Sequence, residues 1–240
     1  MKEVLKFKTL EELSRAAANE VLKEIEAGIR RSGRFTIALS GGHTPSGLYS
    51  ILASDYRDRI KWDAVHFFFG DERYVPHTDN LSNFKMAKLS LLDVVPVPRV
   101  NVHAIPTMLA DADVSAKKYE EELRKTFAGG TQTFDLLLLG MGKEGHTASL
   151  FPRSPALDEK DRWVLPVVVP IVPPERITLT YDALNRSRAT FLLVAGEDKA
   201  ETVGKVLGRD ADYHTFPVKG IHPMSGKLVW YLDAAAASRL

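Results

Sequence analysis

The 240-residue chain contains no cysteine, which excludes disulfides, thiolate nucleophiles, cysteine-bound zinc and iron–sulfur clusters. It also lacks an excess of charge, because 32 basic and 31 acidic residues leave a net charge of +1. This balance argues against a strongly charged surface for nucleic acid or membranes. No apolar run reaches the roughly 18 residues of a membrane helix, since prolines interrupt the most apolar stretch, around residues 165–174.

Targeting signals and linkers are absent too. The first twenty residues carry acidic side chains and lack the apolar centre of a signal peptide, so we expect a cytoplasmic protein. No Gly/Ser/Pro-rich linker or repeat divides the chain, which predicts a single domain over residues 1–240. The histidines lack the close spacings of zinc ligands, so neither a metal nor another cofactor is expected.

Short apolar runs alternate with amphipathic segments along the chain. Strands are predicted at residues 35–39, 64–69, 100–104, 134–139, 163–170, 177–180, 189–195 and 227–232, and helices at 9–30, 48–56, 83–92, 111–127, 197–207 and around the alanine run 234–237. This alternation indicates an α/β fold, a mostly parallel sheet with helices on both faces. Ligands bind such sheets beyond the carboxyl ends of the strands, where three polar segments are predicted to lie.

The first polar segment is SGGHTPS at residues 40–46, between a predicted strand and a predicted helix. Its glycines allow a sharp turn and a close approach to a ligand. Thr44 is expected to cap the helix and Pro45 to take its first position. Free N–H groups there attract an anion, most naturally a phosphate, and Ser40 adds a hydroxyl. The alternative is an ordinary strand-to-helix turn.

The second segment is GDERYVP at residues 70–76. Asp71 or Glu72 is a candidate base, or a residue that orients a base. Arg73 is suited to binding a carboxylate, a phosphate or a developing oxyanion. The alternative is a local Asp–Arg pair that holds the loop.

The third segment is GMGKEGHTASLFP at residues 140–152. It matches the dinucleotide pattern GxGxxG, but Pro152 and Pro155 leave little room for the helix that this pattern requires. It also approaches the P-loop pattern, with His146 where the essential lysine belongs, so ATP and GTP are rejected. A histidine between a glycine and a threonine at a strand end remains, and we interpret His146 as a general base rather than a structural histidine.

These segments resemble those of the 6-phosphogluconolactonase family, which has SGG-x-TP, then GDER-x-VP followed by SN, then GMG-x-DGHTASLFP. The chain has SGGHTP, GDERYVP…SNFKMA and GMGKEGHTASLFP in the same order. PPERITLT at 173–180, GEDKA at 196–200 and the final W-x-x-D at 230–233 extend the likeness over essentially the whole chain. One position departs from the pattern, since Glu144 stands where the family usually has Asp. If Glu144 orients His146, its longer arm has to be absorbed by a backbone shift or a water.

The resemblance implies the fold shared by glucosamine-6-phosphate deaminases and ribose-5-phosphate isomerases, a modified Rossmann-like sheet without a nucleotide. It implies hydrolysis of 6-phospho-D-glucono-1,5-lactone to 6-phosphogluconate, the second step of the oxidative pentose phosphate pathway. The implied partner is a phosphosugar lactone, with a monomer acting beside glucose-6-phosphate dehydrogenase as the working expectation. The implied roles are His146 as base, Asp71 holding the water or His146, Arg73 at the oxyanion, and a 6-phosphate site of Ser40, Gly41, Gly42, Arg176 and Lys199.

Two other functions compete with this interpretation. A glucosamine-6-phosphate deaminase-like enzyme resembles GHIAFNEPG at the third segment and has an acidic group beyond the histidine, where this chain has Phe151, Pro152 and Arg153. A non-enzymatic sugar-phosphate sensor would usually carry a DNA-binding or partner module, for which we find no spare segment.

Overall fold

A six-stranded parallel sheet forms the centre of the computed structural model, which describes residues 2–208, 212–224 and 226–240. Its strand order is β1-β9-β8-β5-β2-β3, and every neighbouring pair runs parallel. The strands are β1 (Lys2–Phe7), β2 (Phe35–Leu39), β3 (Val65–Phe69), β5 (Leu136–Gly140), β8 (Ala189–Val194) and β9 (Lys227–Asp233). All strands point the same way, so the loops that follow them gather at one edge.

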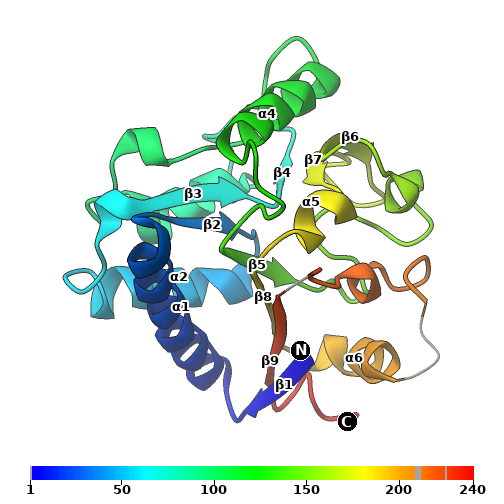
Figure 1. Cartoon of the computed structure of the whole chain (residues 1–240). Helices are drawn as coiled ribbons and strands as arrows, with labels where there is room; N and C mark the ends of the chain where they lie inside the picture. The colour runs from blue at the N-terminus through cyan, green and yellow to red at the C-terminus, as the bar shows by residue number, and fades with distance from the viewer. Residues whose placement is uncertain (1, 209–211, 225) are drawn as a thin grey trace.

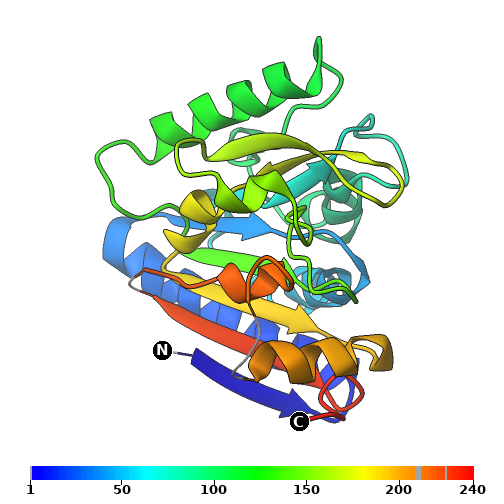
Figure 2. The same cartoon turned by 90° about the vertical axis from the view of Figure 1, so that its right-hand side faces the viewer.

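Helices cover both faces of this sheet. The long α1 (Leu10–Ser32) and α2 (His43–Asp55) lie on one face, and α6 (Ala200–Leu207) lies on the other (Figures 1 and 2). The shorter helices are α3 (Asn83–Ala87), which continues in a π-helical turn at Lys88–Leu92, and α5 (Tyr181–Asn185). Local chemistry sets the ends of α1: the Thr9 side chain accepts a hydrogen bond from the Glu12 N–H, and Gly33 ends the helix at φ 75°.

A second, antiparallel sheet stands beside the first, in the order β4-β7-β6. Its strands are β4 (Asp71–Arg73), β7 (Glu175–Leu179) and β6 (Val164–Val168), and α4 (Ala112–Thr126) packs against β6 and β7 (Figure 1). Gly70 joins the two sheets, because its N–H donates to Leu39 O at 2.9 Å and its carbonyl accepts from Leu179 N at 2.9 Å. Residues just beyond β3 are thereby held against β7.

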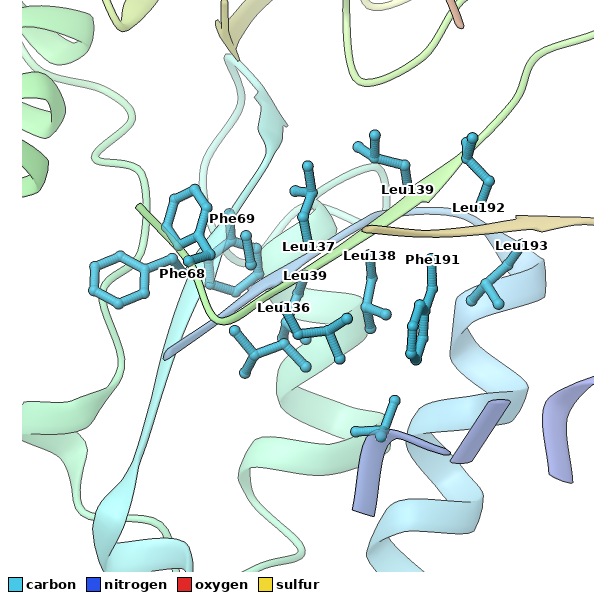
Figure 3. Close-up of a cluster of buried hydrophobic side chains, with 14 of the residues drawn as sticks. Leu39, Phe68, Phe69, Leu136, Leu137, Leu138, Leu139, Phe191, Leu192 and Leu193 are labelled. Atoms are coloured by element: carbon cyan, nitrogen blue, oxygen red, sulfur yellow. The ribbon is translucent and has the colours of Figure 1, made fainter. Parts of the chain in front are cut away.

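Aliphatic and aromatic side chains from both faces of the parallel sheet form the core. Successive residues point to opposite sides, as Leu138 and Leu139 on β5 and Phe191 and Leu192 on β8 show (Figure 3). Each fully buried side chain of this kind contributes about 1.5–3 kcal/mol to folding. The same core includes Val164, Ile177 and Leu179 of the second sheet, in keeping with one domain over residues 1–240, which stays a prediction.

The predicted α/β architecture is confirmed, and several local predictions were wrong. Residues 2–7 form an edge strand that was not predicted, because charged residues interrupt its apolar ones. Residues 100–104 contribute one bridge, Phe67 to Val102, instead of a strand. The alanine run 234–237 forms turns rather than a helix. Among the described residues, no helix is long and apolar enough to cross a membrane.

Candidate active site

A cavity of about 570 Å³ opens at the carboxyl edge of the parallel sheet, a size typical of small-molecule sites. Its walls come from the segments that follow β2, β3, β5, β8 and β9, together with β7 and the β6–β7 hairpin. The structure brings together all the site residues predicted from the sequence, since each lines this cavity: Ser40, Gly41, Gly42, Asp71, Arg73, His146, Arg176 and Lys199.

The start of α2 leaves backbone N–H groups at the cavity. The helix begins at His43, and its N-cap is Gly42, at φ 103° and without a capping side chain. The expected cap at Thr44 and the expected first helical position at Pro45 were therefore wrong, because the helix begins at His43 and both residues lie inside its first turn. Helix N–H groups without a cap attract an anion. At Gly41 a Cβ would lie 1.8 Å from Asn83 Oδ1, so only glycine fits there.

Tyr49 fixes the backbone beside these groups. Its hydroxyl accepts from Ser40 N at 2.9 Å and donates to Ser40 O at 2.8 Å. Burial raises the pKa of Tyr49 above its ordinary value, so the phenol stays protonated and can donate. The backbone of Ser40 is therefore set before any ligand arrives.

The two acidic residues of β4 have different environments. Asp71 lines the cavity, and its carboxylate accepts from Ser149 Oγ at 2.7 Å and from Asn83 Nδ2 at 3.3 Å. Glu72 is not among the lining residues and accepts from the backbone N–H groups of Asn83 and Phe84, both at 2.7 Å. Burial raises the pKa of Glu72 although these hydrogen bonds oppose the shift. Of the two candidate bases, only Asp71 lines the cavity and could contact a ligand there.

Two arginines lie side by side in the cavity wall. Arg73 on β4 is directly opposite Arg176 on β7 in the antiparallel register. Within the described part of the chain, no carboxylate lies within 4 Å of either guanidinium, which excludes the alternative of a local Asp–Arg pair. Arg176 is 4% exposed, and burial, followed by the charge of Arg73, lowers its pKa. Asp71 and Glu72 oppose this shift from a greater distance. Two adjacent cations without a carboxylate in ion-pair contact favour a multiply charged anion such as a phosphate.

A glycine-rich loop after β5 presents His146. The loop closes on itself, since Gly142 N donates to His146 O at 2.9 Å and Gly145, at φ 85°, donates its N–H to Gly142 O at 3.0 Å. Residues 141–154 form turns and no helix, so these glycines do not build a dinucleotide site. Glu144 Oε1 lies 3.0 Å from His146 Nδ1, within ion-pair distance but without the alignment of a full hydrogen bond.

Glu144 therefore reaches the imidazole directly, without a bridging water. The interaction with His146 lowers the pKa of Glu144 to about 2. His146 Nε2 has no hydrogen-bond partner among the described residues. A carboxylate at Nδ1 and a free Nε2 are the arrangement that a general base needs.

The low pKa of Glu144 predicts a pH-dependent stability. Since the folded pKa is below the ordinary 4.5, the ionised carboxylate stabilises the fold above about pH 4.5, and this contribution is lost as the pH falls towards 2. We expect Glu144→Gln to unfold at lower urea concentration than the wild type at pH 6, with the difference narrowing at pH 4 and pH 3. A difference that does not change with pH would contradict the Glu144–His146 pairing.

The room for the imidazole depends on Gly142. A Cβ at this position would lie 2.1 Å from His146 Nδ1 and 2.9 Å from Glu144 Oε2. We expect Gly142→Ala to displace the imidazole and to lower kcat by about 10- to 100-fold, the effect of a misplacement near 1 Å. Gly130→Ala is the matched control, because Gly130 does not line the cavity and the nearest atoms to a Cβ there are 3.5 Å away. Equal kcat values for the two variants would contradict the tight fit at Gly142.

Lys199 and Asp233 complete the wall beyond β8 and β9. Lys199 Nζ lies 2.8 Å from Asp198 Oδ2 and retains 21% side-chain exposure. Asp233 accepts from Gly196 N at 3.1 Å and from Ala236 N at 2.7 Å, which holds the turn that carries Lys199. In the sequence, Asp233 stands out only as part of W-x-x-D. Asn83 also lines the cavity and donates a hydrogen bond to Asp71, and the SN that follows GDERYVP pointed to it in the sequence. No sequence motif pointed to Leu10 or Ile171, which line the cavity as well.

None of these residues forms a metal site. In residues 2–208, 212–224 and 226–240, no group of three or more His, Asp or Glu side chains is placed to hold a metal ion. His66 and His103 do meet, with 3.1 Å between Nδ1 and Nε2, but they lie outside the cavity lining.

The structure is that of an α/β protein with a parallel sheet and a cavity at its carboxyl edge, where proteins of this class bind small ligands. Residues 8–230 match the family described as glucosamine-6-phosphate isomerases/6-phosphogluconolactonase, and the chain belongs to this family. It is 43% identical over 223 residues to the 6-phosphogluconolactonase of Synechocystis sp., covering 92% of this chain and 90% of that protein. It is 40% identical over 232 residues to that of Mycobacterium tuberculosis, covering 94% and 93%.

Solved structures agree with this assignment. The 6-phosphogluconolactonase of Thermotoga maritima is 29% identical and superposes with a TM-score of 0.85, covering 97% of this chain and 100% of that chain. The Trypanosoma brucei enzyme is 28% identical with a TM-score of 0.84, covering 100% and 99%. A monomeric glucosamine-6-phosphate deaminase, at 22% identity and a TM-score of 0.83, shares the fold. The predicted family and fold class are thus confirmed.

Proposed function

We propose that the protein hydrolyses 6-phospho-D-glucono-1,5-lactone to 6-phospho-D-gluconate, the second step of the oxidative pentose phosphate pathway. One observation carries the proposal: a single cavity holds an imidazole with a carboxylate at Nδ1 and two arginines without carboxylate partners among the described residues. The imidazole and its carboxylate serve to activate water. The two arginines serve to bind negative charge on the substrate, at the phosphate and at the developing oxyanion. The names of the relatives support the same reaction.

The 6-phosphate anchors the substrate in this mechanism. Its oxygens accept hydrogen bonds from the backbone of Gly41 and Gly42, just before α2, from the Ser40 hydroxyl, and from Arg176 and Lys199. Arg73, opposite Arg176, extends the positive region to the lactone carbonyl and stabilises the oxyanion. Binding at the phosphate then orients the carbonyl carbon, C1, toward His146.

His146 Nε2 takes a proton from the water that attacks C1, while Glu144 stabilises the imidazolium that forms. Asp71, fixed by Ser149 and Asn83, orients the water. The bond between C1 and the ring oxygen then breaks, and His146 returns the proton to that oxygen. The product is the open-chain acid, and His146 is neutral again.

The deaminase alternative has no support in the described residues. A ring-opening acid would follow the histidine, but the segment after His146 carries no carboxylate before Phe151, which stacks on the imidazole. The cytoplasmic location, the monomeric state and the association with glucose-6-phosphate dehydrogenase stay predictions.

The direct test is hydrolysis of freshly prepared 6-phosphogluconolactone at slightly acid pH, where spontaneous hydrolysis is slow. We expect turnover well above background, and much slower turnover of unphosphorylated gluconolactone. Background rates with the phosphorylated lactone would refute the proposal, and release of ammonia from glucosamine 6-phosphate would establish the alternative.

A further inference from the structure

The imidazole of His146 has an aromatic neighbour that the mechanism above does not use. The ring of Phe151 lies parallel to it, with 4.1 Å between the centroids and 14° between the planes. Phe151 is buried at 3% exposure, so neighbouring residues enclose its ring. The two residues are five apart and belong to no helix, so their contact requires a particular backbone path.

A tight turn provides this path. Thr147 Oγ1 donates to Gly140 O at 2.9 Å, which ties the turn to the end of β5. Leu150 N donates to Thr147 O at 2.9 Å, and Ala148 adopts a positive φ of 48°. The chain therefore reverses directly after His146 and places Phe151 over its ring. A non-glycine residue at positive φ is uncommon and is held here by the surrounding contacts.

Three contacts together define the position of the imidazole. Phe151 covers one face, Glu144 meets the Nδ1 edge, and Gly142 lies so close that a Cβ would collide with the ring. Nε2 is the part of the ring left for a ligand. We propose that Phe151 is a positioning residue for the base His146, holding the imidazole in its reactive orientation and stabilising the imidazolium formed during hydrolysis; this rests on the proposed function.

The face of a phenyl ring carries negative charge density and attracts a cation more than a neutral ring. The stack therefore strengthens when His146 takes a proton, and an interaction that strengthens along the reaction raises kcat rather than lowering KM. The charged or titratable groups that share the cavity are His43, Asp71, Arg73, Arg176, Lys199 and Asp233, with Glu144 at Nδ1. A substitution of Phe151 leaves all of them in place.

The test compares Phe151→Leu, which keeps apolar volume without a π face, with Phe151→Tyr, which keeps the face. We expect Phe151→Leu to lower kcat by about 3- to 30-fold with KM within about twofold, and Phe151→Tyr to retain most of kcat. Phe127→Leu removes a buried aromatic ring at the end of α4, outside the cavity lining, and is expected to leave both constants unchanged.

Proton NMR detects the stacking of Phe151 on His146 independently of catalytic activity. The Cε1 proton of His146 is shielded by the ring current of Phe151, and its resonance is expected to move downfield in Phe151→Leu but not in Phe127→Leu. Wild-type kcat in a folded Phe151→Leu protein, or equal losses in Phe151→Leu and Phe127→Leu, would overturn the proposal on Phe151 while leaving the lactonase intact. A wild type that does not hydrolyse the lactone would overturn both.

Discussion

His146→Ala is expected to lower kcat by about 100- to 10,000-fold while KM changes little, since a positioned general base contributes an acceleration of this size. The imidazole is oriented for the task, with Glu144 at Nδ1 and, in the described part of the chain, no protein partner at Nε2. The phosphate-binding groups are on other elements, so substrate binding should survive the substitution. Steady-state kinetics on the phosphorylated lactone, corrected for spontaneous hydrolysis, measures both constants.

His222→Ala is the matched control for this variant, because His222 is exposed and does not line the cavity. It should behave as the wild type. Retained kcat in His146→Ala would remove the imidazole from the mechanism and move the base to Asp71, whose carboxylate is held firmly by neighbours at the cavity. Asp71→Asn would then be the variant that loses kcat.

Arg176→Ala is expected to raise KM by about 10- to 100-fold, because a hydrogen bond to a charged group contributes about 1.5–3 kcal/mol. The effect should be confined to the phosphorylated lactone, and the weak turnover of unphosphorylated gluconolactone should be nearly unchanged. The ratio of kcat/KM between the two lactones therefore reports on the phosphate contact directly. If this ratio stays at the wild-type value, Arg176 does not bind the phosphate.

The melting temperature of Arg176→Ala distinguishes weaker substrate binding from a loss of folding. Arg176 is buried beside Arg73 without a carboxylate partner among the described residues, and both burial and the neighbouring charge lower its pKa. Desolvation and the repulsion from Arg73 outweigh the attraction of Asp71 and Glu72, so removing this charge relieves a cost to folding. We therefore expect Arg176→Ala to keep or raise the melting temperature while binding weakens. Arg99→Ala, at an exposed arginine outside the cavity lining, is expected to change neither KM nor the ratio.

The cavity could be located from the sequence because parallel strands end at one edge of a sheet. Ser40, Asp71 and His146 each follow an apolar run closely, and the alternation of runs and amphipathic segments predicts a parallel sheet. Such local patterns can be recognised in the sequence without knowing the order of the strands in the sheet. The same signals failed for β1, where charged residues interrupt the apolar ones, and for the alanine run 234–237, where good helix formers lie in turns at the end of the described chain.

The fold class, the family and the three loops that form the cavity could be predicted from the chain alone, because they depend on hydrophobic periodicity and on glycine-rich motifs within short segments. The contacts between side chains in the cavity could not be predicted in this way. The antiparallel register of β4 and β7 sets Arg73 beside Arg176, and the turn after Thr147 lays Phe151 on His146. Such contacts depend on strand pairing and side-chain packing across the fold, which no local pattern in the chain encodes.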